Sequence, residues 1–331
     1  MNEERNSGRV FLDLGYITKV NINALNSSDN LGGNVVIIKK FQDSKGNYYV
    51  YVSGQAFRYY LKYSLMQLGM ELTKIDKSGE IIIDKRAPTE IKERMKYIIK
   101  NHPDLDLFGF MEAKTKSQQA ALRRWSPVKV SPLINIFPWR NETDLLTRKK
   151  EGQEGGDLVK VEVNALNYMR GTTIINVNEV GSYIDELNLE LEDVIGNEER
   201  NKRIELLLEA FKNLSGGGKI ARLLDDITPK FLIIAKQKAG TPIFLNSLMV
   251  DEEGNIKIEL IKESLEEYED MVEDCIIGIR SGIFANENEI RNSFKENNGK
   301  DVKVVSISEA IDTAKKWISS NTKNNSEKTS N

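Results

Sequence analysis

The stretch VFLDLGYITKVNIN, residues 10–23, decides the class of fold because apolar and polar side chains alternate along it. Leu12, Leu14 and Tyr16 fall on one side of an extended chain, whereas Asp13 and Gly15 fall on the other. This alternation predicts a long β-strand with one buried face. Further extended segments are predicted at residues 35–41, 48–52, 80–84, 104–111, 128–137, 159–163, 172–177, 229–236, 241–250, 255–261, 275–282 and 301–306.

Helical spacing follows several of these strands. Phe57, Leu61 and Leu65 recur on one helical face, with Ser53 as a good N-cap and Gly69 as the stop. Further helices are predicted at residues 91–99, 198–214, 263–274, 287–298 and 308–319. Strands and helices are interspersed, and many strand pairs are close enough for hairpins. The pattern therefore predicts an α+β fold with a mostly antiparallel sheet.

Composition and charge narrow the classes of function. The chain has 331 residues and a formal net charge of -3, so any nucleic-acid binding must come from local basic patches. The single Cys275 excludes an intramolecular disulfide and fits a reducing cytosol, and the single His102 excludes a zinc site built from two histidines. No signal peptide or membrane-length apolar run is visible, and we expect a cytoplasmic protein without metal or cofactor.

The stretch SGGGKIARLLDDITPK, residues 215–230, suggests a phosphate-binding loop. It is not a nucleotide-triphosphate loop, because Ile220 stands where the magnesium-binding hydroxyl is needed and the preceding segment has helical spacing. Two interpretations remain open. The glycines Gly216, Gly217 and Gly218, with Lys219 and Arg222, suit contact with an anion. The same glycines also suit a plain helix C-cap followed by a flexible connection.

A second anion seat is predicted where a strand meets a helix in YYVYVSGQAFRYYLK, residues 48–62. Ser53 and Gln55 lie in the first helical turn, where free N–H groups favour an anion. Arg58 and Lys62 are four residues apart and away from the apolar stripe, so they form either part of this seat or an ordinary solvated edge. The polar loop 23–34 offers amide and hydroxyl groups as well, and Asp29 is its one acid.

Basic residues also gather around aromatic ones. Arg123 and Arg124 precede Trp125, a grouping that suits a single strand of nucleic acid, although Trp125 is equally suited to a core. Basic residues recur, at Trp139-Arg140 beside an aromatic ring and in the run 148–150, within a polar segment at residues 138–157. Such a segment is typical of a long hairpin tip. A charge run of this kind is more often a solvated face. Together these separated patches favour a binder of an extended polyanion over an enzyme with one compact pocket.

The order of six segments resembles the DevR-like family of CRISPR-associated Cascade backbone subunits, in its type I-B branch. These segments are ITKVNINALNSSDNLGGN at 17–34, VSGQAFRYYLK at 52–62, DLDLFGFM at 104–111, RWSPVKVSPL at 124–133, NALNYMRGTTIINVNEVG at 164–181 and GGGKIARLLDDITPKFLI at 216–233. The resemblance implies a ferredoxin-like, RNA-recognition-type palm over residues 1–318. It also implies finger or helical insertions at about 70–135 and 181–214, a thumb at about 138–160, and a polar tail at 319–331 that we expect to be disordered.

The resemblance also implies a function. Family members polymerise head to tail along CRISPR RNA, contact other Cascade subunits and present the guide in segments for pairing with target DNA, without cutting it. The residues that would contact RNA are Asn21, Asn23, Asn26, Ser53, Gln55, Arg58, Lys62, Arg123, Arg124, Arg140, Gly216, Gly217, Gly218, Lys219 and Arg222. Two alternatives stay open: a metal-assisted endoribonuclease that uses Asp29, like type III backbone proteins, and a stand-alone RNA-binding regulator.

Overall fold

The computed structural model describes residues 8–27, 35–112, 121–149, 156–185, 190–218, 220–294 and 302–328. Its strands are β1 (Phe11–Asn23), β2 (Val35–Val36), β3 (Lys40–Gln42), β4 (Tyr48–Val52), β5 (Phe110–Glu112), β6 (Leu122–Arg124), β7 (Val128–Val130), β8 (Leu133–Asn135), β9 (Thr143–Lys149), β10 (Gly156–Glu162), β11 (Asn164–Asn176), β12 (Ser182–Ile184), β13 (Leu191–Asp193), β14 (Phe231–Gln237), β15 (Val272–Ile279) and β16 (Lys303–Val305). Its helices are α1 (Gly54–Gln67), α2 (Ile91–Asn101), α3 (Pro103–Phe108), α4 (Asn197–Ala210), the 3-10 turn η1 (Phe211–Asn213), α5 (Ile258–Glu267), α6 (Glu287–Ser293) and α7 (Ile307–Lys328).

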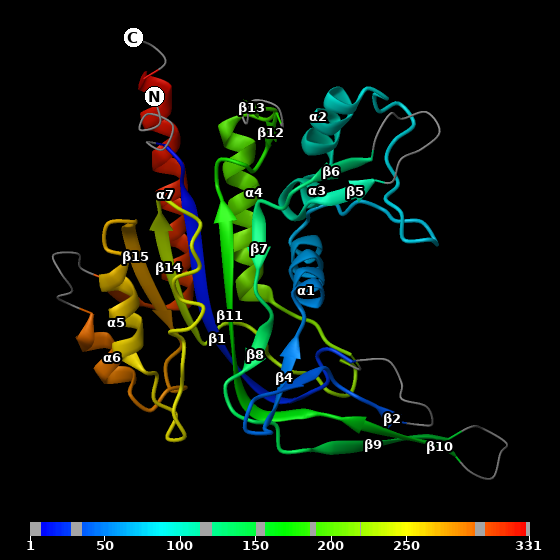
Figure 1. Ribbon diagram of the computed structural model, residues 1–331, viewed down its shortest axis with the longest axis vertical. Coiled ribbons are helices and arrows are strands. Elements are labelled where there is room, and N and C mark those ends of the chain that lie inside the picture. Colours follow the sequence, from blue (N-terminus) through cyan, green and yellow to red (C-terminus); the bar gives the residue numbers. More distant parts are fainter. Residues whose placement is uncertain are drawn as a thin grey trace.

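A nine-stranded sheet runs through the described part of the molecule in the order β16-β15-β14-β1-β11-β8-β4-β3, with β7 also paired to β11. The predicted long strand β1 lies near its middle, antiparallel to β11 on one side and β14 on the other (Figure 1). Every pairing in this sheet is antiparallel except that between β15 and β16. The prediction of an α+β fold with a mostly antiparallel sheet is confirmed.

Helices cover both faces of the sheet, so each face has its own apolar core. On one face α1, α4 and α7 pack over β1, and the rings of Tyr16, Phe57 and Phe211 contact one another. On the other face α5, α6 and the segment 243–256 cover β14 and β15, where Phe231 and Phe244 are fully buried. Figure 1 shows the two groups of helices on opposite sides of the strands.

The segment between α1 and β7 forms a lobe of its own beside α1 (Figure 1). It contains α2, α3 and the β5–β6 hairpin, and its apolar core is centred on Ile98 and Ile99. Residues 104–111 were predicted to be extended, and this is wrong for most of them because α3 occupies 103–108. Pro103 begins that helix, where its missing N–H is not needed, and Gly109 ends it with a φ of +68°.

Three other predicted strands are wrong. Residues 255–261 were expected to be extended, but Ile258, Ile261 and Leu265 carry the buried face of α5. Their spacing of three and four residues fits a helix, and the next strand starts only at Val272. Residues 241–250 form turns joined to the chain ahead by a single bridge between Val250 and Ile256, and residues 80–84 contribute only the bridge of Ile81 to Ile75.

A hairpin of β9 and β10 projects from the lower end of the sheet, with β2 parallel to β10 (Figure 1). Its base is fixed by a small core of Ala24, Ile38, Val50, Val161 and Val163. At the C-terminal end of the described chain, α7 continues to Lys328, past residue 319, where the predicted disordered tail begins.

Candidate nucleic-acid interface

Three segments that are far apart in the sequence meet where β1 ends: residues 24–26, the first turn of α1, and the glycine turn 216–218. The Gly218 N–H donates to the Ala24 carbonyl at 2.9 Å. The Ser53 N–H donates to the Asn26 side-chain oxygen at 2.9 Å. The Tyr60 hydroxyl of α1 donates to the Leu25 carbonyl. We call this junction the glycine-turn site; it brings together three segments that the sequence singled out separately: the polar loop after β1, the start of α1 and the glycine turn.

The glycines of this turn are required by close packing as well as by backbone shape. A Cβ at Gly216 would lie 2.2 Å from the ring of Tyr60, and one at Gly218 would lie 3.0 Å from the Ala24 carbonyl. Gly217 has a φ of +120°, which an L side chain rarely adopts. The plain helix-cap interpretation therefore does not account for the turn, because its backbone is held against β1 and α1.

The asparagines of β1 are held from within the protein by Asp225, an acid that the sequence analysis did not single out. Its carboxylate accepts from the backbone and side-chain N–H groups of Asn21 and, at 2.7 Å, from the side chain of Asn23. Asn23 is buried and its amide holds Asp225, which fixes the chain after the glycine turn, so its contact with RNA stays a prediction that this arrangement does not favour. Asn21 remains exposed despite this bond. Asn26 is half-buried, and its side-chain oxygen is occupied by Ser53.

The first turn of α1 is built as predicted, whereas its basic edge is not. Ser53 caps the helix by accepting from the Ala56 N–H at 3.3 Å, and Gln55 is exposed. Lys62 does not face solvent freely; it pairs with buried Asp104 at 3.1 Å. Arg58 lies over the Phe108 ring at 5.6 Å, and burial lowers its pKa. The two cations thus lean onto α3, and the ammonium of Lys62 is engaged by Asp104, while their role in a phosphate seat stays a prediction.

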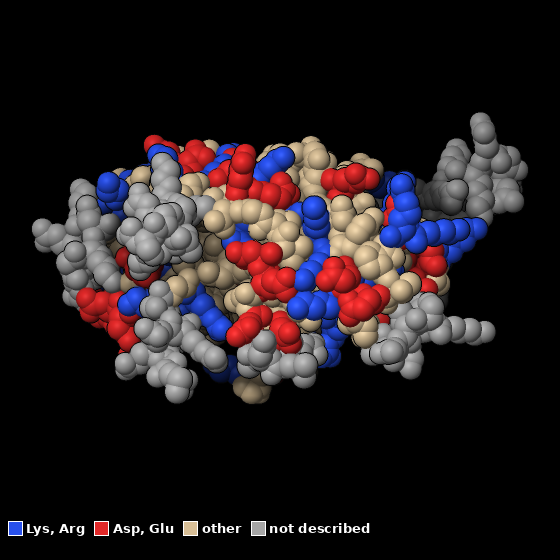
Figure 2. Space-filling view, turned by 90° about the horizontal axis from the view of Figure 1, so that it is seen from above, with Lys and Arg blue, Asp and Glu red and all other residues tan. Residues whose placement is uncertain are grey.

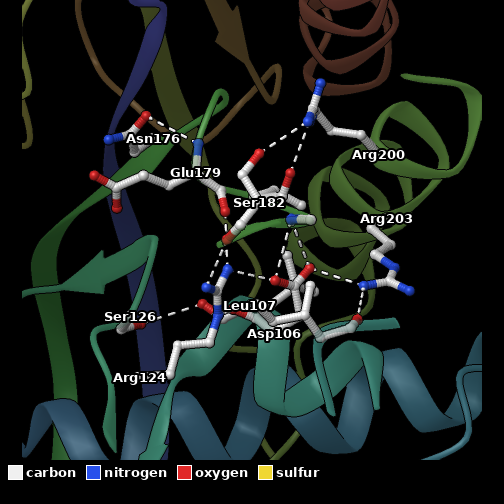
Figure 3. A network of polar contacts seen from close by, with 12 residues as sticks. Asp106, Leu107, Arg124, Ser126, Asn176, Glu179, Ser182, Arg200 and Arg203 are labelled. Atoms are coloured by element: carbon white, nitrogen blue, oxygen red, sulfur yellow. Dashed lines mark hydrogen bonds and ion pairs between the residues drawn. The ribbon is translucent and has the colours of Figure 1, made fainter. Parts of the chain in front are cut away.

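Arg123 and Arg124 point to opposite sides of β6, because successive side chains alternate along a strand. Arg123 is exposed and lies 4.4 Å from the ring of Trp125, which is itself 67% exposed and therefore not a core residue. Arg124 points inward and pairs with the fully buried Asp106 (Figure 3). Its Nε, Nη1 and Nη2 all donate within the protein, so its contact with RNA stays a prediction that this arrangement does not favour.

Asp106 organises a buried polar network that joins the lobe to the rest of the molecule (Figure 3). Besides Arg124, it accepts from Arg203 of α4 at 2.8 Å and from the Gly181 N–H at 3.0 Å. Arg124 and Arg203 also donate to backbone carbonyls, among them Ser182 and Ile99. The network thereby ties α3 and β6 to α4 and to the turn after β11.

The remaining predicted contacts divide between exposed residues and residues outside the described part. Arg222 and Arg140 are exposed, the first just after the glycine turn and the second at the base of the β9–β10 hairpin. Lys219 and Asp29 lie outside the described residues. Lys40 pairs with Glu162 at 2.6 Å and lies over the Trp139 ring at 4.0 Å, a brace for the hairpin that the sequence did not reveal.

The charge on one end of the molecule is mixed. Figure 2, which views the end carrying α2 and the β12–β13 hairpin, shows basic and acidic side chains interspersed without a large field of one sign. Within the described residues, no group of three or more His, Cys, Asp or Glu side chains could hold a metal ion. None of the described helices combines the length and apolar character that crossing a membrane requires.

A family model described as CRISPR-associated negative auto-regulator DevR/Csa2 matches residues 15–250. Two solved chains share the fold: one titled "CRISPR RNA-guided surveillance complex, pre-nicking", at a TM-score of 0.57 and 12% identity, covers 93% of this chain and 100% of its own. The other, titled "CRISPR RNA-guided surveillance complex", has a TM-score of 0.53 and 14% identity and covers 93% of this chain and 99% of its own. A comparison with curated protein sequences finds no match.

Proposed function

The chain belongs to the DevR/Csa2 family of CRISPR-associated proteins, and from this premise we propose that it is a non-catalytic backbone subunit of a type I-B Cascade complex. In this role it binds CRISPR RNA in the cytoplasm, associates head to tail with its own copies and with other Cascade subunits, and presents the guide for pairing with target DNA. The observation that carries the proposal is the convergence of residues 24–26, the first turn of α1 and the glycine turn in one junction.

A palm of the ferredoxin type is part of the proposal. The succession β1, α1, β8, β11, α4 and β14 supports it, because the strands lie in the order β14-β1-β11-β8 and both helices pack on the same face. With α4 in the palm, the second finger insertion shrinks to the β12–β13 hairpin at 182–193. The lobe between α1 and β7 is then the first finger, and the β9–β10 hairpin is the thumb.

The glycine-turn site suits the backbone of a nucleic acid. The capped start of α1 gives this site a partial positive charge. Arg222 brings a full charge beside the turn. Such contacts bind phosphates and carry no sequence information. This is what a protein needs if it leaves sequence recognition to a guide.

The test begins with the protein purified from a heterologous host, its 260/280 nm absorbance ratio, and separate digestion by RNase and DNase. We expect RNase-sensitive oligomers whose mass grows stepwise with RNA length. Arg222→Ala should weaken RNA binding and lower the slope of log affinity against log salt by about 0.7. Arg86→Ala is the matched control, because Arg86 is a highly exposed arginine of the distant lobe. A protein that ignores CRISPR RNA at low salt would refute the proposal.

A stand-alone RNA-binding regulator is the second candidate, favoured by the words "negative auto-regulator" in the family description. It differs from a backbone subunit in one measurable respect. A regulator binds a fixed number of copies to a defined RNA, whereas a backbone subunit adds copies as the RNA lengthens. Light scattering on a series of RNA lengths distinguishes the two. RNA cleavage that is lost in Asp29→Ala would instead favour the endoribonuclease.

A further inference from the structure

The outward face of α1 carries aromatic side chains in place of the expected charges. Gln55, Tyr59, Tyr63 and Met66 follow one another at helical spacing, and the last three are 66%, 38% and 45% exposed. Residues four apart on a helix are neighbours, about 6 Å apart along the axis. The helix therefore presents a continuous stripe of two phenol rings and a thioether to solvent. We call these four residues the α1 stripe.

The stripe is left uncovered because the other sides of α1 pack against the sheet and against α3. Phe57, Leu61 and Leu65 are fully buried against the sheet. Arg58 and Lys62 are drawn sideways onto α3 by Phe108 and Asp104. The charged side chains that would ordinarily solvate this helix are thus turned away, and the rings form its outer surface.

The stripe is continuous with the glycine-turn site. It starts at Gln55, in the helical turn that Ser53 caps. Tyr59 contacts the ring of Tyr60 edge to face, with centroids 6.3 Å apart. Tyr60 in turn supports Gly216 with its ring and holds the Leu25 carbonyl with its hydroxyl. A ligand whose backbone rests on the glycine turn therefore lies one side chain away from the exposed ring of Tyr59.

We propose that Tyr59 and Tyr63 stack on bases of the RNA strand whose phosphates contact the glycine-turn site. This inference rests on the proposed function and adds a second kind of contact to it. Exposed aromatic side chains beside a phosphate contact are the usual means by which proteins hold single-stranded nucleic acids, and stacking tolerates any base. A tyrosine ring also suits this task because it loses little conformational freedom when it binds.

The test compares Tyr59→Leu/Tyr63→Leu with wild type on two RNAs of equal length, one intact and one with abasic positions. The double variant should bind intact RNA more weakly, by about 5- to 150-fold for each ring that stacks. Its salt slope should stay unchanged, because stacking releases no counterions. Tyr59→Phe/Tyr63→Phe keeps the rings and should retain near wild-type binding. Tyr48→Leu is the matched control, since Tyr48 is a 41% exposed tyrosine on strand β4 and not part of the α1 stripe.

Abasic RNA provides the decisive comparison. If the rings stack on bases, abasic positions weaken binding to wild type but add little further loss in the leucine variant. Equal binding of intact RNA by the leucine variant and wild type, at an unchanged thermal midpoint, would overturn the inference while leaving the proposed function intact. Loss of RNA-free self-association, with RNA affinity unchanged, would also overturn it by assigning the stripe to a second copy. Failure of wild type to bind any RNA would overturn both proposals.

Discussion

Replacing Asp106 by asparagine should destabilise the protein strongly, because it leaves buried positive charge without a counter-ion. The Asp106 side chain is fully buried, and the side chains of Arg124 and Arg203 are only 6% and 3% exposed. Asparagine keeps the size of the aspartate but removes its charge. It also turns an NH₂ group toward donors, since both carboxylate oxygens accept hydrogen bonds in the native protein.

The size of the effect follows from the burial. Breaking a buried ion pair by removing one partner costs about 3–5 kcal/mol, a large part of the roughly 5–15 kcal/mol that stabilises a typical domain. Unfolding entropy is about 2.1 cal/mol/K per residue, so for 331 residues this loss lowers the thermal midpoint by about 4–7 °C. The lobe should loosen first, because the network is its main polar tie to α4.

Thermal unfolding followed by circular dichroism measures this loss, and hydrogen exchange in α2 and α3 reports loosening of the lobe. Glu199→Gln is the matched control, because Glu199 pairs with the same Arg203 but its side chain is 45% exposed. It should cost about 0.5 kcal/mol or less. Replacing Asp106, Arg124 and Arg203 together by apolar residues should recover much of the stability. If Asp106→Asn unfolds within 1 °C of Glu199→Gln, the network does not stabilise the fold as reasoned.

Three further predictions concern other parts of the molecule. Burial raises the pKa of Asp13 to about 8, so the folded state holds a proton that the unfolded state releases above about pH 4. Stability should therefore fall as pH rises from about 4 to 8, by up to about 1.4 kcal/mol per pH unit. Asp13→Asn should flatten this fall in thermal midpoints measured across that range. Parallel curves would contradict it. Gly216→Ala should lower the free energy of unfolding by about 1–3 kcal/mol and weaken RNA binding in a filter assay, because the added methyl group would lie 2.2 Å from the Tyr60 ring. Adding Tyr60→Leu should recover part of the stability. Lys62→Met should lower stability more than RNA affinity, because its ammonium holds Asp104; an RNA defect without a stability loss would restore Lys62 to the binding surface.

Much of the fold could be predicted from local pattern, and the failures share a physical cause. The alternation in β1 and the cap at Ser53 act within a few residues, so both were predictable. Residues 104–108 and 258–261 are short apolar-polar segments whose spacing fits either a strand or a helix. Both are helical in the structure because tertiary packing, rather than local pattern, determines their conformation.

The candidate site divides in the same way. Gly216, Gly217 and Gly218 are visible in the sequence because only glycine tolerates such crowding. The inward orientation of Arg124 could not be predicted, because its partner Asp106 lies 18 residues away and only the strand register turns the side chain inward. Neither could the exposure of Tyr59, which depends on where the neighbouring charges find their partners.

The central place of β1 has a consequence for synthesis on the ribosome. Its partner strands arrive late: Asp13 of β1 and Gln237 of β14 meet across 224 residues of chain. At about 5–20 residues per second, β1 waits roughly 10–45 s for that neighbour. Until β11 emerges both edges of this apolar strand are open to other nascent chains, and the β14 edge stays open for the whole wait. We therefore expect the yield of folded protein to depend on chaperones that shield the emerging N-terminal region, and to improve when translation is fast or the temperature is low.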